Sequence, residues 1–347
     1  ICFMEDRQAR IMRGGGTHRS CLCDKVRSVN NLFTAWYEFK RGKQLRADVL
    51  AFELNLEDQI LELYYSLKDR TYKHGGYESF YLSDPKRRHI HKASVRDRLL
   101  HHALVRVIEP TFEKNFIFDS WSCRKDKGIH KAAIRFQKIA LLLSRNNTRP
   151  VWILKLDIRK FFDSIDHDIL LEIVFKRVKC PETRALITEI VGSYSPGIPL
   201  GNLTSQLFAN VFMNEFDQYA KRVLKTRYYL RYCDDFAIIS PDKKVLEELL
   251  PRIRTFLSDR LRLRLHPDKI VLKRFSQGVD FLGFICFPYH LILRTKTKRR
   301  MLRRVTEDNL TSYLGLVSHT RSRRIRTQLL QNSNENRNTR PARDERR

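Results

Sequence analysis

The sequence predicts an α+β fold, in which helices combine with strands and hairpins. Two kinds of pattern predict it: long segments carry apolar residues at helical spacing, and short apolar runs bounded by turn residues are typical of strands. The chain of 347 residues is long enough for two or three subdomains and a sizeable core. Helices and strands are therefore expected to share one fold that is divided into subdomains.

Six segments have the apolar periodicity of helices. They are residues 56–72, 94–116, 167–178, 182–191, 205–224 and 243–261. Strands are expected elsewhere: residues 76–93 alternate around an Asp-Pro turn like a basic hairpin, and residues 150–158 form an apolar, β-branched run. Residues 262–275 and 278–294 predict short strands joined by turns.

The two ends of the chain are expected to be poorly ordered. Residues 1–30 are polar, basic and glycine-rich, as flexible termini commonly are. Residues 321–347 are basic and poor in apolar residues, so we expect them to be disordered unless nucleic acid or a partner orders them.

The charge of the chain favours a polyanionic partner. It has 67 Lys and Arg residues against 39 Asp and Glu residues, which gives a net charge of +28. Nucleic acid is the commonest such partner. A membrane surface is the competing one, but no segment reaches the ~18 consecutive apolar residues of a membrane helix, and no membrane partner is expected. The seven cysteines are scattered without a C-x-x-C pair, which favours a reducing compartment, and a cytoplasmic location is expected.

Two adjacent carboxylates interrupt the apolar stretch LRYCDDFAIIS. Asp234 and Asp235 lie at the expected turn between two strands. Like charges at close range raise each other's pKa and cost free energy unless a positive group neutralises them. A divalent cation with oxygen ligands is the usual neutraliser. The alternative is an ordinary hairpin turn, since turns favour Asp.

A third carboxylate, Asp157, ends the apolar strand at 150–158. It could instead cap a helix, but Asp163, Asp166 and Asp168 fit that role better because they lie in the polar loop that leads into the next helix. Carboxylates on two neighbouring strands are what two-metal phosphoryl transfer requires. In a strongly basic protein this pattern indicates nucleotidyl transfer.

These segments resemble, in order and spacing, the motifs of reverse transcriptases. YCDD is similar to their Tyr-x-Asp-Asp box, LKLDIRKFFDSIDH to their first catalytic motif, and GIPLGNLTSQLFANVFMNEFD to their Gly-x-x-x-Ser motif and its helix. SVRDRLLHHAL resembles part of the fingers of bacterial retroelement enzymes, and LHPDKIVL and VDFLGF resemble the two motifs after the active site. The resemblance covers about residues 55–290. It implies a right-hand polymerase fold, with fingers and palm at 31–285 and a short helical thumb at 286–320. The palm would be an antiparallel sheet backed by helices.

The stretch LGNLTSQ, residues 200–206, narrows the resemblance to one group of reverse transcriptases. Most reverse transcriptases have Gln before the Gly and Ser-Pro at the end, whereas an aliphatic residue and Ser-Gln are similar to the enzymes of diversity-generating retroelements. The resemblance implies error-prone complementary DNA synthesis from a template-repeat RNA, in mutagenic retrohoming. The implied partners are the template RNA, the RNA/cDNA heteroduplex, deoxynucleotides and a pentameric accessory variability protein. The alternatives are a group II intron-like or retron-like reverse transcriptase, or a non-catalytic RNA-binding scaffold with the same fold.

By this resemblance the carboxylates hold two Mg²⁺ ions. Asp157 and Asp234 would ligate both ions with help from the carbonyl of Ile158, and Asp235 would support the second ion less directly. Phe162 would be the steric gate that excludes a ribose 2′-OH, while Phe161 would be a core residue, although the two roles could be exchanged.

Other residues would contact the nucleotide. The backbone N–H groups of Lys160 and Phe161 could hold the triphosphate, as turn amides commonly hold anions. Lys86 and Arg88 correspond to a fingers hairpin that grips the incoming phosphates, but they could equally contact template phosphates. Lys269 corresponds to a lysine proposed as general acid for pyrophosphate, or it is a solvated loop residue.

Leu200, Gly201 and Gln206 would line the pocket of the nascent base pair. A Leu side chain offers no hydrogen-bond donor or acceptor where accurate relatives have Gln. Gln206 replaces a Pro and so returns a backbone N–H. We therefore expect a less directional pocket and an error-prone enzyme, most so opposite template adenines. Alternatively, Leu200 simply packs beneath the sheet.

Overall fold

The computed structural model describes residues 21–83, 87–318, 320 and 322–338. It confirms the α+β class, because helices combine with antiparallel sheets. The chain forms two compact units. The first unit comprises residues 1–81, 89–115 and 167–208, and the second comprises residues 82–88, 116–166 and 209–347.

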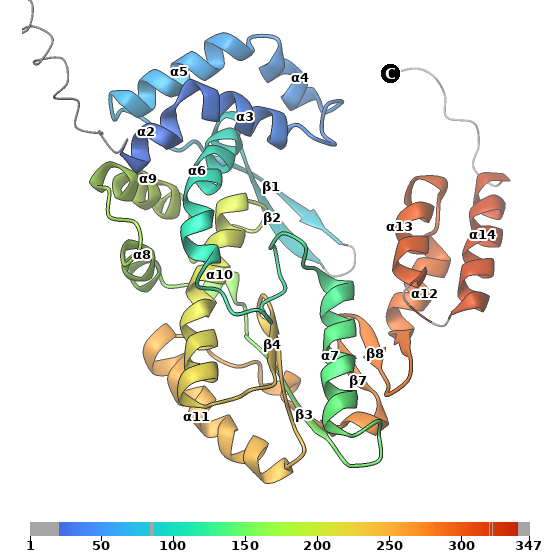
Figure 1. Ribbon diagram of the computed structural model, residues 1–347. Helices are drawn as coiled ribbons and strands as arrows, with labels where there is room; N and C mark the ends of the chain where they lie inside the picture. The colour runs from blue at the N-terminus through green and yellow to red at the C-terminus, as the bar shows by residue number, and fades with distance from the viewer. Residues whose placement is uncertain (1–20, 84–86, 319, 321, 339–347) are drawn as a thin grey trace, which may run out of the picture. The chain divides into compact units, whose positions relative to one another are not determined.

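The first unit is mainly helical, with one hairpin. Serine caps begin two of its helices: the side chain of Ser28 accepts a hydrogen bond from the N–H of Asn31, and that of Ser94 from the N–H of Asp97. Helix α3 packs along α6, and α2 packs on both (Figure 1). Its elements are α2 (Leu22–Arg27), α3 (Val29–Phe39), α4 (Ala47–Glu53), α5 (Leu56–Lys68), strands β1 (Tyr77–Leu82) and β2 (Arg88–Ala93), α6 (Val95–Glu113), α8 (His167–Phe175), α9 (Pro181–Gly192) and the start of α10 (Leu203–Gln218).

Helix α2 lies within the segment 1–30 that was expected to be flexible. Cys23 and Val26 on this helix are buried, and α2 packs against α6. The burial of these side chains explains why the segment from residue 21 onward is helical despite its polar composition. Residues 1–20 lie outside the described part of the chain.

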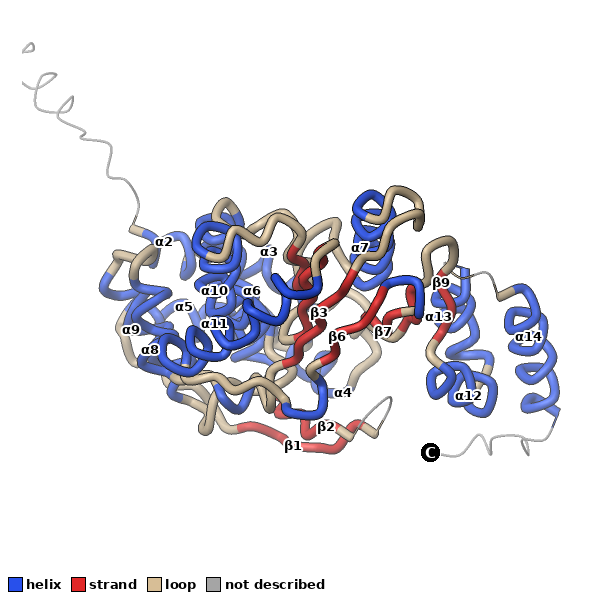
Figure 2. The backbone as a smooth tube through the Cα atoms, turned by 90° about the horizontal axis from the view of Figure 1, so that it is seen from below, coloured by secondary structure: helices blue, strands red, loops and turns tan. Residues whose placement is uncertain are grey.

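A four-stranded antiparallel sheet forms the centre of the second unit. Its strands are β3 (Trp152–Asp157), β4 (Tyr229–Tyr232), β5 (Asp235–Ser240) and β6 (Val271–Arg274), in the order β4-β5-β3-β6. Strand β3 is therefore interior and pairs with β5 on one side and β6 on the other, as Figure 2 shows for β6. Its buried pattern matches the apolar run that predicted it.

A second, three-stranded sheet and several helices complete this unit. The side chain of Phe136 on α7 stacks on Phe281, with ring centroids 4.7 Å apart, so α7 lies against the small sheet (Figure 1). The core continues into the last helices through Met301, Val317 and Leu329. These elements are α7 (Ile129–Leu143), α11 (Lys243–Leu261), β7 (Val279–Phe281), β8 (Phe284–Cys286), β9 (Leu291–Leu293), α12 (Thr295–Arg304), α13 (Glu307–Ser318) and α14 (Arg323–Asn338), and α10 enters the unit and ends in a π-helical turn at Tyr219–Val223.

Helix α14 forms in the tail that was expected to be disordered. Leu329 on this helix is fully buried, and α14 packs on α12 and α13. The few apolar residues of the tail are sufficient because they meet neighbouring helices. Residues 339–347 lie outside the described part of the chain, and the division into fingers, palm and thumb stays a prediction. No helix among the described residues combines the length and the apolar character needed to cross a membrane.

A buried ion pair joins β4 to α10. Arg231 and Asp217 are both fully buried, and the guanidinium donates two hydrogen bonds, of 2.8 and 2.6 Å, to the two carboxylate oxygens. The same guanidinium donates to Asn210, to Ser120 and to the carbonyl of Cys233. Its charge and its N–H groups are therefore well satisfied, as burial of an arginine requires.

Removing one side chain of the Arg231–Asp217 pair should destabilise the fold, because the other charge then stays buried without a counter-ion. We expect Asp217→Ala to lower the free energy of unfolding by about 3–5 kcal/mol, because the Arg231 charge stays buried without its counter-ion. Urea denaturation would measure this loss. Glu247→Ala, which breaks the exposed pair with Lys243, is the control and should cost less than about 1 kcal/mol. Equal losses in the two variants would contradict the structural role of the buried pair.

Candidate active site

The pairing of β3 with β5 brings the three predicted aspartates to one edge of the sheet. Asp157 lies directly opposite Asp235 in the antiparallel register. One residue further on, the N–H of Ile158 donates to the backbone carbonyl of Asp234 at 3.2 Å. Cys233 has a left-handed φ of 56°, which turns the chain tightly between β4 and β5. The end of one strand and the turn between two others therefore meet, as the sequence predicted.

Two lysines neutralise part of this acidic edge. The Nζ of Lys269 lies 2.6 Å from Oδ1 of Asp157, and the Nζ of Lys155 lies 3.3 Å from Oδ2 of Asp235. The loop that carries Lys269 is held to β3, because the N–H of His266 donates to the carbonyl of Asp157. Sequence reasoning found Lys269 but missed Lys155. Strand alternation could have found it, because Lys155 and Asp157 are two residues apart and so share a face.

Burial dominates the electrostatics of Asp234. It raises the pKa of this carboxyl, and the negative charge of Asp157 raises it further. The positive charges of Lys269 and Arg88 oppose the shift without cancelling it. Arg88, at the exposed start of β2, thus favours the charged form of Asp234. We call Asp157, Asp234 and Asp235 together the carboxylate edge. Lys86, the other predicted hairpin cation, lies outside the described residues.

Asp235 is affected in the same way. Burial raises its pKa to about 6, since the ammonium of Lys155 compensates only in part and the charges of Asp157 and Asp234 add to the rise. Its Oδ1 atom is buried and, among the described residues, accepts no hydrogen bond. A buried carboxylate oxygen without a donor is a costly group that a cation would satisfy.

The residues at this edge fit a divalent cation. Carboxylate and carbonyl oxygens are the ligands that Mg²⁺ prefers. Asp157, Asp234 and Asp235 offer carboxylates, and Ile158, directly after β3, offers a backbone carbonyl. In the described part of the chain, no group of three or more His, Cys, Asp or Glu side chains is arranged to hold a metal ion as it stands. Lysine ammonium groups lie against Asp157 and Asp235, at the carboxylate oxygens that a cation would use. The number and kind of ions stay a prediction.

The two phenylalanines after β3 differ in burial. Phe161 is 3% exposed, whereas Phe162, which begins a short 3-10 turn at Phe162–Ser164, is only partly buried. Their rings meet edge to face with centroids 5.4 Å apart. Phe161 is therefore a core residue, and the role of Phe162 as the gate stays a prediction. Lys160 has a left-handed φ of 45° and Phe161 a right-handed one, a combination that turns successive N–H groups toward one side and suits an anion.

The predicted base-pair residues belong to the first unit. The carbonyl of Leu200 accepts a hydrogen bond of 3.1 Å from the N–H of His91 on β2. Gly201 has a φ of +123°, and a Cβ there would lie 3.3 Å from the carbonyl oxygen of His91, so only glycine fits easily. Gln206 is exposed on the first turn of α10, and its N–H donates to the carbonyl of Asn202.

A basic pocket that sequence reasoning missed lies beside Gly201 and Gln206. It has a volume of about 390 Å³ and includes Lys43, Arg98 and His102 in its lining. Burial and the nearby positive charges, that of Lys43 first, lower the pKa of His102 to about 4. His102 is therefore favoured in its neutral form within this basic pocket. No sequence pattern could have shown this pocket, because its residues come from distant segments.

The sequence matches the family described as "Reverse transcriptase (RNA-dependent DNA polymerase)" over residues 78–286. It is similar to Protein YkfC of Escherichia coli (strain K12), with 27% identity over 266 residues that cover 65% of this chain and 68% of YkfC. It is also similar to the group II intron-encoded protein LtrA of Lactococcus lactis subsp. cremoris, with 22% identity, covering 66% of this chain and 49% of LtrA.

Among solved structures, apo telomerase from Candida tropicalis aligns with a TM-score of 0.49 and 12% sequence identity. The alignment covers 70% of this chain and 52% of the telomerase chain. The chain thus spans about two thirds of the length of YkfC and about half the length of LtrA and of this telomerase.

Cation binding at the carboxylate edge can be measured through its effect on the melting temperature of the protein. We expect millimolar Mg²⁺ to raise the melting temperature of the protein, because a bound cation stabilises the folded state by about 1–3 kcal/mol at ten to a hundred times its dissociation constant. Asp234→Asn should abolish the rise. Asp242→Asn, which keeps a good helix cap on α11, is the control and should retain it. An equal rise in the Asp234 variant would place the cation elsewhere.

Proposed function

The chain belongs to the reverse transcriptase family, and from this premise we propose that it is an active enzyme that copies an RNA template into complementary DNA. The observation that carries the proposal is the carboxylate edge formed by Asp157, Asp234 and Asp235. Burial and mutual repulsion raise the pKa of Asp234 and Asp235, so the edge costs stability unless cations occupy it. A scaffold that only binds RNA would have no physical reason to keep such a group.

Each residue of the edge has a chemical task under this proposal. Two Mg²⁺ ions, when bound, would activate the primer 3′-hydroxyl and neutralise the leaving group. Asp157 and Asp234 would hold them, with the carbonyl of Ile158. Asp235 is paired with Lys155, which supports its less direct role. Lys269 holds its ammonium against Asp157, from where it could deliver a proton to pyrophosphate once a cation takes its place.

The nucleotide would be selected by residues beside this edge. Phe162 is partly exposed next to the buried Phe161, which suits a ring that excludes a 2′-OH. The turn at Lys160 offers N–H groups to the triphosphate. The net charge of +28 supports binding of the template RNA and of the RNA/cDNA heteroduplex through their phosphates.

We further propose that the enzyme belongs to a diversity-generating retroelement and is error-prone. Leu200 and Gln206 support this, because they replace the Gln and Pro of most reverse transcriptases. The proposal includes a template-repeat RNA and a basic, pentameric accessory protein as partners. The competing candidate is a group II intron-like reverse transcriptase, which the similarity to LtrA favours. Synthesis that depends on the accessory protein and is inaccurate at adenines would separate the first from the second.

The catalytic assignment can be tested with Asp234→Asn. We expect primer extension on an RNA template to fall by at least about 100-fold, because the developing charge loses its stabilising ligand set. The affinity for RNA should change little, since phosphate contacts elsewhere supply most of it. Extension at nearly the wild-type rate would show that the two-metal assignment is wrong.

The sugar gate can be tested with Phe162→Ala. We expect the ratio of ribonucleotide to deoxynucleotide incorporation to rise by roughly tenfold or more, since the clash with the 2′-OH is removed. Competition between the two nucleotides in single-nucleotide extension would measure it. Phe161→Ala is the matched comparison. Altered sugar selectivity in that variant alone would show that the two roles are exchanged.

Fidelity can be tested with Leu200→Gln. A Gln amide can hydrogen-bond the nascent pair, and one such bond is worth about 0.5–1.5 kcal/mol, or roughly two- to tenfold in discrimination. We therefore expect fewer misincorporations opposite template adenines, with extension retained. Sequencing the complementary DNA made by both enzymes would measure this. Equal error rates at adenine would leave Leu200 as a packing residue.

A further inference from the structure

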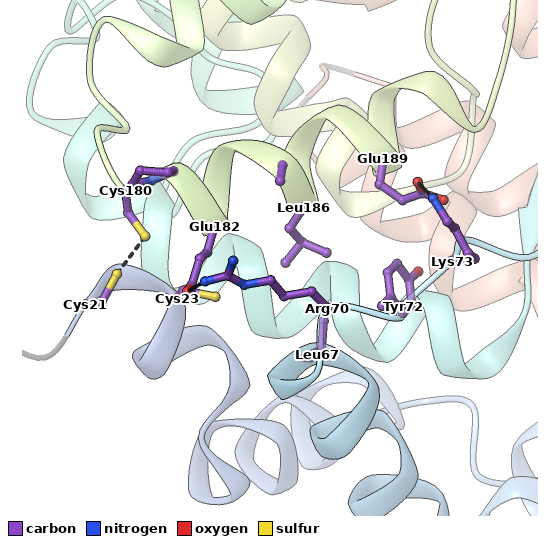
Figure 3. A pocket seen from close by; sticks show the side chains of 12 residues that line it. Cys21, Cys23, Leu67, Arg70, Tyr72, Lys73, Cys180, Glu182, Leu186 and Glu189 are labelled. Atoms are coloured by element: carbon purple, nitrogen blue, oxygen red, sulfur yellow. Dashed lines mark hydrogen bonds and ion pairs between the residues drawn. The ribbon is translucent and has the colours of Figure 1, made fainter.

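Two cysteine side chains, which are not part of the carboxylate edge, lie against each other in the first unit. The Sγ atoms of Cys21 and Cys180 are 2.7 Å apart, although 159 positions separate the residues in the sequence. Cys21 immediately precedes α2, and Cys180 is the residue that caps the start of α9 (Figure 3). Both side chains are partly exposed, so small reagents in solution can reach them.

The surroundings of Cys180 favour its thiolate. Partial burial raises the pKa of this thiol, but the contact with Cys21 and the nearby polar groups of Thr183 outweigh burial and lower the pKa to about 7. The start of a helix stabilises a thiolate in the same sense. A thiol whose pKa is near the ambient pH is the best placed to attack a disulfide, because it combines a large thiolate fraction with high nucleophilicity.

Cys21 has the complementary property. The contact with Cys180 is the main factor that raises the pKa of Cys21, which favours the thiol form of Cys21 beside the Cys180 thiolate. A thiolate with a second thiol in contact is the arrangement of an attacking and a resolving cysteine.

A pocket adjoins the two sulfurs. It has a volume of about 560 Å³, and Cys21, Cys23 and Cys180 are among its lining residues. Leu67 and Leu186 give it apolar surface, as Figure 3 shows. The pocket is therefore large enough for a small organic molecule.

Ion pairs line the same pocket. Arg70 pairs with Glu182, and Lys73 pairs with Glu189 at 3.0 Å. Such paired side chains can exchange partners with the carboxylate and ammonium groups of a peptide-like molecule. The combination of apolar surface and matched charges suits a zwitterionic thiol compound better than a simple anion.

We propose that Cys180 and Cys21 form a thiol–disulfide exchange site that reacts with a low-molecular-weight disulfide of the glutathione class. The Cys180 thiolate attacks one sulfur of that disulfide, the S–S bond breaks, and one thiolate leaves. Cys21 then loses its proton to solvent and attacks the Cys180 sulfur of the mixed disulfide, which releases the second thiolate. The protein loses two electrons and the small disulfide gains them, and the product is a Cys21–Cys180 disulfide between the start of α2 and the start of α9.

Cys23 is close by but differs chemically, and so it provides a matched control. It is buried, and burial together with the neighbouring Glu182 raises its pKa to about 12. It is therefore a thiol at neutral pH and a poor competitor for the exchange. Within the described residues, the three sulfurs are not arranged as a metal-holding group.

The test uses the full chain, oxidised glutathione as the probe, and mass spectrometry after the free thiols are blocked and the protein is digested with trypsin. In the wild type and in Cys23→Ser, we expect a disulfide between the peptides of residues 20–25 and 180–184. In Cys21→Ser, Cys180 should carry a glutathione adduct that persists. In Cys180→Ser, neither product should form. A linkage through Cys23, or no linkage in the wild type, would overturn the proposal.

A second measurement on the unmutated chain avoids any folding defect of the variants. The rate of alkylation of Cys180 by iodoacetamide should rise with a midpoint near pH 7. At pH 7 it should exceed that of a short unstructured cysteine peptide by roughly threefold, because a larger thiolate fraction is partly offset by lower intrinsic nucleophilicity. Equal rates for Cys180 and the peptide would overturn the proposed attacking role of Cys180.

Discussion

The ion pair between Arg231 and Asp217 is the constraint on which the geometry of the carboxylate edge depends. Arg231 lies on β4 only three residues before Asp234, and its guanidinium also binds the carbonyl of Cys233, within the turn itself. Asp217 lies on α10, so the pair joins the strand to the helix behind it. The backbone of Arg231 is held as well, since its N–H donates to Asp119 and its carbonyl accepts from Trp121. A buried charge pair thus positions a turn that must carry carboxylates of its own.

The carboxylate edge itself lowers the stability of the fold. Neighbouring strands put Asp157 opposite Asp235, where the main-chain register allows no larger separation. Lys155 and Lys269 relieve the repulsion only in part, as the raised pKa values of Asp234 and Asp235 indicate. Functional sites commonly lower the stability of the fold that carries them. A carboxylate edge that cations would stabilise, held in place by the surrounding fold, is such an arrangement.

The sequence predicted this edge well and other features poorly, for physical reasons. The strand that ends at Asp157 and the turn at Asp234 are local patterns, so each could be recognised within about ten residues. Helix α7 was not predicted, and α14 was taken for disordered chain because its few apolar residues matter only through tertiary burial of Leu329. The contact of Cys21 with Cys180 joins segments that nothing in the local sequence relates. Periodicity carries no information about such pairs.

The segment at Leu200 is held by its main chain, so its side chains can differ without a change of fold. Its position is fixed by main-chain contacts, because the carbonyl of Leu200 accepts from the N–H of His91. The close approach of the His91 carbonyl and the positive φ favour glycine at position 201. Neither contact depends on the side chain at position 200. An amide or an aliphatic group can therefore occupy that position on the same backbone, and the hydrogen-bonding capacity of the pocket can vary independently of its architecture. The same holds for Gln206. Its N–H forms a hydrogen bond in the first turn of α10, whereas its side chain is exposed and can be replaced without disturbing that turn. The side chains at positions 200 and 206 can thus vary on the same main-chain frame, and the fidelity role assigned to them stays a proposal.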